Sequence, residues 1–184
     1  PLVVPSSAFA DELAYRTVTA SAFAEAPLAC HDAVTRGKVL TDFARRCDAE
    51  AHPEAAQEDA VAGEDINGRR RGQHMAPYDW RRDGRRVACK SAQLKWDSTN
   101  ESWQLQFTKV KLASPGGGGA AFDELQLAAY TPEGVHLFRH DLRAGVSTHG
   151  KQTEATGRHI VFCGPKYERD WRTSLAAILG KLEA

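Results

Sequence analysis

Long hydrophobic runs are missing from this sequence of 184 residues, in which no apolar stretch approaches the roughly 20 residues that a membrane-spanning helix needs. The short apolar run near the N-terminus follows no basic segment, so the pattern of a secretory signal peptide is missing as well. We therefore expect an intracellular protein, cytoplasmic or nuclear, that does not contact a membrane.

Cysteine is scarce and scattered. The four cysteines, Cys30, Cys47, Cys89 and Cys163, form no CxxC pair, and the neighbouring histidines do not give the spacing of a standard zinc module. Cys89 and Cys163 lie within apolar runs, where a small buried thiol is the usual explanation. We expect free thiols in a reducing compartment.

Two common catalytic signatures are also lacking. No GxSxG elbow is present, which argues against a serine hydrolase. The glycine run 116–119 is not followed by the Lys-Ser/Thr pair and helix of a phosphate-binding loop.

Net charge is zero, with 24 basic and 24 acidic residues, but the charge is unevenly distributed. Residues 1–66 hold five basic and twelve acidic side chains, whereas residues 67–111 hold eleven basic and four acidic ones. Such asymmetry is typical of a protein with a polyanionic partner, although acidic neighbours in the fold would balance the basic segment equally well.

The hydrophobic pattern predicts an α+β fold with a mixed β-sheet flanked by helices. We expect helices over 31–50 and 168–184 and a shorter one within 50–66. A three-stranded antiparallel meander is expected over 76–112, two strands over 122–140 and one strand over 159–165. Residues 1–30 are interpreted as an N-terminal arm, with a helix around 8–20 as an alternative, and residues 31–184 as the domain.

One pair of residues suggests chemistry. Asp79 precedes the tight-turn dipeptide Asp83-Gly84, and Lys90 lies within the following strand, so a hairpin would bring the two side chains together. A carboxylate can bind Mg²⁺, which activates water and stabilises charge on a phosphate, and a neighbouring lysine can neutralise developing negative charge. Alternatively, Asp79 caps a turn or pairs with a neighbouring arginine, and Lys90 is an exposed edge lysine.

The arrangement resembles the PD-(D/E)XK nuclease superfamily, which has the restriction-endonuclease-like fold. Tyr78-Asp79 matches the Pro-Asp element and Ala88-Cys89-Lys90 matches the (D/E)XK element. The resemblance extends over about residues 31–182. It implies a Mg²⁺- or Mn²⁺-dependent endodeoxyribonuclease of the restriction type that acts on DNA, with Asp79 as a metal ligand, Lys90 as a catalytic residue and a homodimer as one assembly to test.

The sequence departs from the family pattern at two positions. Ala88 stands where the resemblance implies an acid, and Thr41, beside Asp42, stands where it implies a helix glutamate. Three explanations stay open: a relative that binds DNA without cleaving it, an acid or amide supplied from elsewhere, or an introduced substitution. The candidate replacements are Glu64, Gln93, Glu101 and Asp123, of which Asp123 is preferred as a second metal ligand.

The basic segment supplies the predicted DNA contacts, because arginine matches the geometry of phosphate. The predicted DNA-binding residues are Arg69, Arg70, Arg71, Arg81, Arg82, Arg85, Arg86, Ser91 and Gln93. Two alternatives to a nuclease remain: a non-catalytic nucleic-acid-binding module with the same fold, and a protein-interaction domain in which the acidic and basic segments pair.

Overall fold

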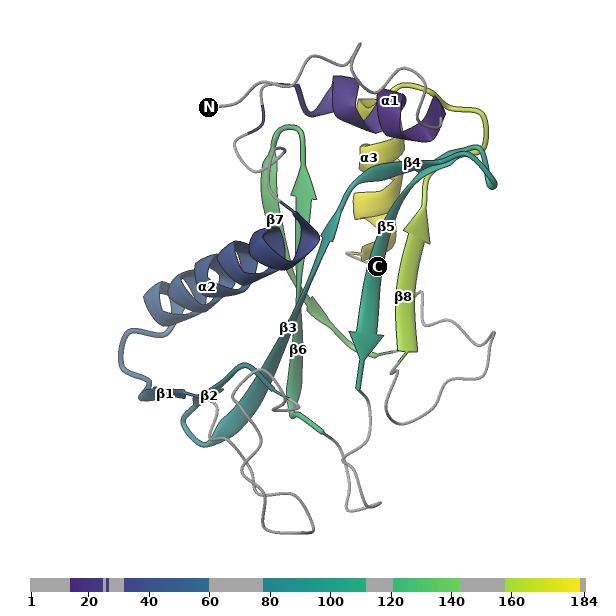
Figure 1. Ribbon diagram of the computed structural model, residues 1–184. Helices are drawn as coiled ribbons and strands as arrows, with labels where there is room; N and C mark the ends of the chain where they lie inside the picture. The colour runs from purple at the N-terminus through teal and green to yellow at the C-terminus, as the bar shows by residue number, and fades with distance from the viewer. Residues whose placement is uncertain are drawn as a thin grey trace, which may run out of the picture.

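A computed structural model describes residues 14–24, 26, 32–59, 78–111, 121–142 and 158–182. The helices are α1 (Ala14–Ala22), α2 (Ala33–Ala51) and α3 (Trp171–Leu182). The strands are β1 (Gln57–Asp59), β2 (Trp80–Arg82), β3 (Arg85–Gln93), β4 (Lys95–Asp97), β5 (Ser102–Val110), β6 (Glu124–Thr131), β7 (Gly134–His140) and β8 (Arg158–Cys163) (Figure 1). The predicted α+β class with a mixed sheet is confirmed.

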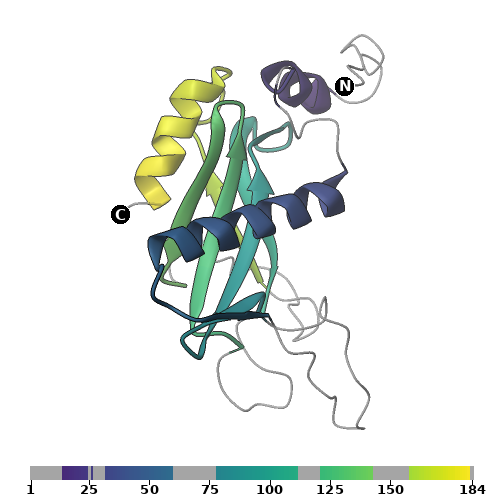
Figure 2. The same cartoon turned by 90° about the vertical axis from the view of Figure 1, so that its left-hand side faces the viewer.

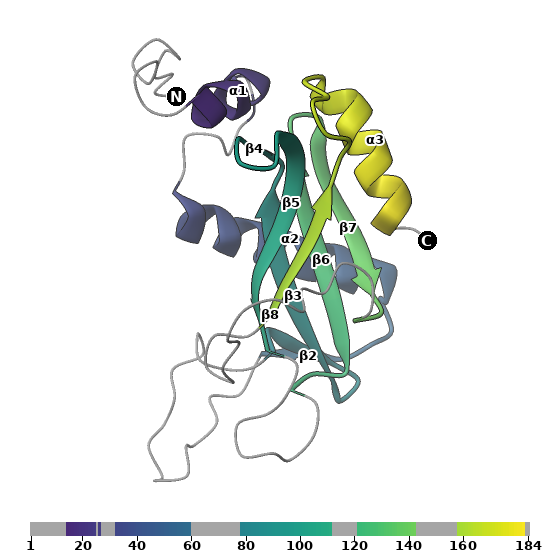
Figure 3. The ribbon, with the colours of Figure 1, turned by 90° about the vertical axis from the view of Figure 1, so that its right-hand side faces the viewer.

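Five strands form one sheet in the order β1-β2-β3-β6-β7, and three form a second in the order β4-β5-β8. Among the strand pairs of the described residues, only β3–β6 is parallel. Helix α2 crosses one face of the larger sheet (Figure 2), and β5 and β8 lie on the opposite side of that sheet from α2 (Figure 3).

Helix α2 confirms the expected helix over 31–50. Asp32 caps its N-terminus, because its carboxylate accepts hydrogen bonds from the backbone N–H groups of Val34 and Thr35. Leu40 and Ala44 are buried toward the sheet. The expected helix within 50–66 is wrong over Gln57–Asp59, which form edge strand β1; the rest of that segment from residue 60 lies outside the described residues.

The β2–β3 hairpin turns at Asp83-Gly84, as predicted. Asp83 has φ 47° and Gly84 has φ 76°, the left-handed conformations that a type I′ turn requires at both central positions. The Asp83 backbone N–H donates to the carbonyl of Ala56, and its carboxylate accepts from the Ala56 N–H, so the turn also holds the start of β1.

Strands β3 and β4 are separated only by Leu94 and form one nearly continuous extended segment, the β3–β4 path. Strand β6 lies along one edge of this segment: it pairs with β3, and the Leu94 N–H donates to the carbonyl of Tyr130. On the other edge, β2 pairs with 85–87 and β5 pairs with 95–97. We call the stretch 88–94, which lies between those two antiparallel partners, the fork. The expected simple meander is therefore wrong: both hairpins form, but the third strand pairs with β4 in a separate sheet.

The main core lies between the two sheets. Large buried side chains of the smaller sheet, Trp103, Leu105 and Phe107, join Leu125 and Leu127 of β6 in one cluster. Helix α3 packs on β5 and β8 and buries Leu175 and Ile178. Apolar burial of this kind is the principal stabilising contribution, at roughly 25 cal/mol per Å² removed from water.

The described part of the N-terminal segment is packed on the domain. The Trp96 backbone N–H donates to the Thr19 hydroxyl of α1 at 2.9 Å, and Phe23 is buried with its ring centroid 5.1 Å from that of Tyr130. Of the helices in the described ranges, none is long and apolar enough to cross a membrane.

Candidate functional site

Asp79 lies where the β2–β3 ladder ends. Its backbone N–H donates to the carbonyl of Val87 at 2.8 Å, and its carboxylate accepts from the backbone N–H of Cys89 at 2.6 Å. The Asp79 carboxylate thus takes the place of the backbone carbonyl that would accept this hydrogen bond if the β2–β3 pairing continued. Burial raises the pKa of the Asp79 carboxyl above its ordinary value, against the lowering effects of the Cys89 N–H and of Lys90.

Asp79 forms hydrogen bonds with Val87 and Cys89, and Ala88 is the residue between these two. Ala88 therefore lies directly across from Asp79. Its side chain is buried. The position that the nuclease resemblance assigns to an acid is therefore the cross-strand neighbour of Asp79, where Cβ atoms are typically about 5 Å apart. Alanine offers no ligand atom there.

Lys90 lies in the fork, one residue beyond Cys89, and is half-buried. It is close enough to Asp79 for its charge to lower the pKa of that carboxyl. The side chains of Cys89 and Lys90 point to opposite faces of β3. Cys89 faces α2, where the Thr41 hydroxyl contacts its thiol. Burial raises the pKa of the Cys89 thiol to about 12, so this cysteine is a neutral packing residue. The structure brings Asp79, Ala88 and Lys90 together, as expected.

Asp123 does not offer a free carboxylate. Its oxygens accept hydrogen bonds from the backbone N–H, the Nε and the Nη2 of Arg86, at 2.8, 3.1 and 2.8 Å. These bonds lower the pKa of Asp123 to about 2. The expectation that Asp123 serves as the second metal ligand is corrected, because Arg86 already occupies both oxygens, and Arg86 in turn is not free for phosphate.

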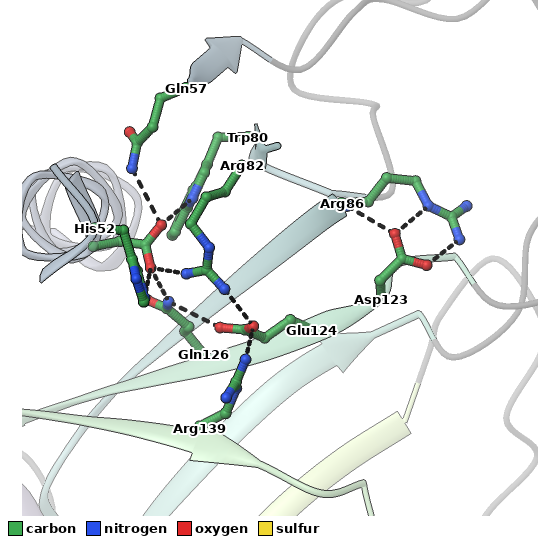
Figure 4. Close-up of polar contacts among 10 residues, drawn as sticks. His52, Gln57, Trp80, Arg82, Arg86, Asp123, Glu124, Gln126 and Arg139 are labelled. Carbon is green, nitrogen blue, oxygen red and sulfur yellow. Dashed lines mark hydrogen bonds and ion pairs between the residues drawn. The ribbon is translucent and has the colours of Figure 1, made fainter. Parts of the chain in front are cut away.

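The expectation for Arg82 is also corrected. This residue was expected to bind DNA, yet it is buried between α2 and the sheet, where its Nη1 donates to Asp48 and its Nη2 donates to Glu124 at 2.7 Å (Figure 4). The Trp80 indole N–H donates to Asp48 at 2.9 Å, and Arg139 donates to Glu124. Although burial acts to raise it, the hydrogen bonds from Arg139 and Gln126 hold the pKa of Glu124 below its ordinary value.

Sequence reasoning missed this buried network. The available signal is Asp48 itself, which continues the buried positions Leu40 and Ala44 at a spacing of four residues and so places a carboxylate on the apolar stripe of α2. A charge on such a stripe requires a buried partner. Because alternate strand residues face opposite sides, Arg82 shares the side of buried Trp80 and meets Asp48.

Two hairpin arginines remain available for an anion. Arg85 is exposed. Arg81 lies with its guanidinium carbon 5.5 Å from the centroid of the Tyr78 ring, and its Nε is buried without a hydrogen-bond partner among the described residues. Arg69, Arg70 and Arg71 lie outside the described residues.

Ser91 and Gln93 lie on the face of β3 that α2 covers. A Cβ placed on Gly37 would lie 3.5 Å from the Ser91 hydroxyl, so this hydroxyl abuts the helix. Gln93 is the register partner of Tyr130. The expectation that Ser91 and Gln93 contact DNA is therefore corrected, because both side chains point toward the face that α2 covers.

Of the other proposed replacements for the missing acid, Glu101 does not reach Asp79. Glu101 lies in the β4–β5 turn, at the far end of the β3–β4 path, with φ 48°. Glu64 lies outside the described residues.

The fit of a metal ion is incomplete. Mg²⁺ is usually held by one or two carboxylates together with water and phosphate oxygens. Within the described part of the chain, the site offers one carboxylate, Asp79, with a raised pKa, and no three His, Cys, Asp or Glu side chains gather as a metal site.

Comparisons with protein-family models, with curated proteins and with solved structures found no match.

Proposed function

We propose that this chain is a DNA-binding domain of the restriction-endonuclease-like type, whose metal-dependent endodeoxyribonuclease site lacks one carboxylate at Ala88. The observation that carries the proposal is the bond between the Asp79 carboxylate and the Cys89 N–H. It fixes Asp79 opposite Ala88 and beside Lys90, which is the arrangement that the PD-(D/E)XK resemblance implies. The order β2-β3-β6, with a hairpin followed by a parallel strand, is compatible with it.

Lys90, Arg81 and Arg85 would bind different parts of a phosphodiester. Lys90 supplies a positive charge beside Asp79, where it would stabilise charge on a phosphate oxygen. Arg81 and Arg85 lie on the same hairpin and would contact the DNA backbone, which carries sequence-independent affinity. Asp79 alone provides too few ligands for strong metal binding, so cleavage by this chain is expected to be weak or absent.

The test introduces the missing carboxylate at position 88. The chain and the Ala88→Glu variant are incubated with supercoiled plasmid and Mg²⁺ or Mn²⁺, and nicking is followed on gels. We expect the variant to nick plasmid at least tenfold faster than the unchanged chain, and Lys90→Ala in the same background to remove that gain. Isothermal titration with Mn²⁺ alone reports whether the second carboxylate creates a metal site.

Ala92→Glu is the matched control, because Ala92 is also a buried alanine of β3 but lies four residues beyond Ala88. It adds the same charge to the same strand without placing it opposite Asp79. Circular dichroism establishes that each variant folds, and Ala88→Asp replaces any variant that does not. The proposal is wrong if folded Ala88 variants neither bind Mn²⁺ nor nick DNA.

The incomplete metal fit favours a second candidate, a non-catalytic nucleic-acid-binding module. For this candidate, gel-shift affinity for duplex DNA falls steeply with salt. It also falls in the Arg81→Ala/Arg85→Ala double variant, while Ala88→Glu gains no cleavage. A protein-interaction domain would instead show no DNA binding even at about 50 mM salt, where screening is weak.

A further inference from the structure

A groove lies at the end of the molecule away from the β2–β3 hairpin, with a volume of about 780 Å³. Its walls come from four places in the sequence: α1, the start of β5, the turn between β6 and β7, and the start of α3 with the residues just before it. The apolar part of the lining includes Val18, Ala22, Trp103 and Pro132, and the polar part includes Arg169 and Arg172. Among the described residues, no acidic side chain lines it, so this part of the groove combines an apolar wall with two positive charges.

The two arginines are held in place by aromatic rings. The guanidinium carbon of Arg169 lies 4.2 Å from the centroid of the Trp96 ring, and that of Arg172 lies 4.4 Å from the centroid of Trp171. The Trp103 indole N–H donates to the carbonyl of Arg169 at 3.0 Å, which fixes the backbone there. Cation–π contacts of this kind orient a guanidinium without consuming its hydrogen-bond donors.

Neither guanidinium forms an ion pair with a carboxylate of the described residues, although Arg169 and Arg172 are both exposed. The nearby Asp170 attracts Arg172, but its own oxygens accept from the Thr173 N–H and hydroxyl as the cap of α3. Among the described residues, no carboxylate therefore occupies the planar donors of either arginine, which leaves these donors for an anion that enters the groove.

We propose that this groove binds a nucleotide of single-stranded nucleic acid, with the phosphate on Arg169 and Arg172 and the base against the apolar wall. A nucleotide carries an aromatic body and an anionic group, which matches the two parts of the lining. The volume falls within the range of roughly 300–1,000 Å³ that small-ligand sites occupy, which suits one strand and not a duplex.

The groove is separate from the Asp79 site and does not depend on it. Six residues of nearly continuous strand lead from Lys90 to Trp96, which is about 20 Å at 3.3 Å per residue. That length corresponds to about six nucleotide steps at 3.4 Å each along one strand of DNA. A strand end released from a duplex at Lys90 would thus reach the groove.

The test measures binding of a fluorescein-labelled 12-residue oligo(dT) by anisotropy, with EDTA present. We expect Arg169→Ala/Arg172→Ala to weaken binding at least tenfold and Arg169→Lys to weaken it less, because lysine keeps the charge but loses the planar donors. Quenching of tryptophan emission by unlabelled oligo(dT) should disappear in the double variant. Lys166→Ala is the matched control, since it removes an exposed cation of the same connection that does not line the groove.

Three results would overturn the inference. One is equal weakening by Lys166→Ala, which indicates general charge. Another is an equal loss of affinity for a 12-base-pair duplex, which indicates that the arginines bind backbone of any form. The third is competition by polyglutamate as effective as that by oligo(dT), which indicates an acidic peptide. Because the assay contains no metal and leaves Ala88 unchanged, failure of the nuclease proposal leaves its outcome unchanged.

Discussion

The Asp79 carboxylate and the Cys89 backbone N–H are joined by a hydrogen bond of 2.6 Å at the point where β2 and β3 separate. This bond gives Asp79 a structural role as well as the role that we propose for it in the site. The two roles respond differently to substitution, and the difference can be measured.

We predict that Asp79→Ala lowers the free energy of unfolding by about 1–3 kcal/mol, because the Cys89 N–H loses its acceptor in a half-buried position. Asp79→Asn keeps an acceptor oxygen and should cost less. Urea unfolding of both variants provides the measurement. Equal losses would indicate that the charge, not the hydrogen bond, is what the fold requires.

The pKa of Asp79 predicts how its contribution depends on pH. Because burial raises the folded pKa above the unfolded value of 3.8, protonated Asp79 contributes stability that is fully present below pH 3.8 and is lost as pH rises through the folded pKa. We therefore expect Asp79→Asn, which cannot ionise, to gain stability relative to the unchanged chain as pH rises from 4 to 7. Urea midpoints across that range test this, and a constant difference between the two proteins would contradict it.

The Asp123–Arg86 pair predicts a dependence of the opposite sign. The pKa of Asp123 is lowered from 3.8 to about 2, so its contribution is present above pH 3.8 and is lost as pH falls toward 2. The stability difference between the unchanged chain and Asp123→Asn should shrink between pH 5 and pH 2. Both side chains are partly exposed, so screening by solvent should keep the effect small. An unchanged difference at pH 2 would show that the ion pair is not the cause.

The buried network predicts a much larger effect. Arg82→Met leaves Asp48 and Glu124 without their shared partner and should destabilise the fold by about 3–5 kcal/mol. Arg86→Met removes the partly exposed partner of Asp123 and should cost about 1 kcal/mol or less. Guanidinium unfolding compares the two. If the costs are similar, Arg82 is not buried between the two acids.

Gly164 predicts a steric effect. A Cβ at this position would lie 2.8 Å from the Cβ of Ser174, a buried residue of α3. Gly164→Ala should therefore cost about 1–3 kcal/mol through overpacking. Ser174→Ala should not relieve the clash because it keeps the Cβ, whereas Ser174→Gly should relieve part of it. Thermal unfolding of the single and double variants measures this coupling, and equal behaviour of the two rescue variants would refute the contact.

Local signals predicted the parts of the fold that depend on neighbours in sequence. Asp83-Gly84 predicted the hairpin and Asp32 predicted the start of α2, because a turn and a cap are set by a few adjacent residues. The separation of β5 from β3 could not be predicted in this way. It depends on β6 occupying one edge of β3, and β6 begins at Glu124.

The same limit explains the outcome for the arginines. Arg81, Arg82, Arg85 and Arg86 look alike in a list of residues, yet only Arg82 is enclosed by acids from α2 and β6. Composition identified a basic segment, but the number of its charges that remain free depends on partners far away in the chain. Asp79, Ala88 and Lys90 were predicted as neighbours because a single hairpin connects them.

The wide separation of the contacts that close the fold has a consequence for its kinetics. Residue partners are 37 positions apart at Arg86–Asp123, 59 apart at Gln104–Cys163 and 77 apart at Thr19–Trp96. Chains dominated by such distant contacts pay the loop-closure entropy before they gain the contacts, so they fold in milliseconds to seconds. As the chain is synthesised, β3 is complete before β6 emerges, so the edge of β3 that pairs with β6 stays unpaired during that interval.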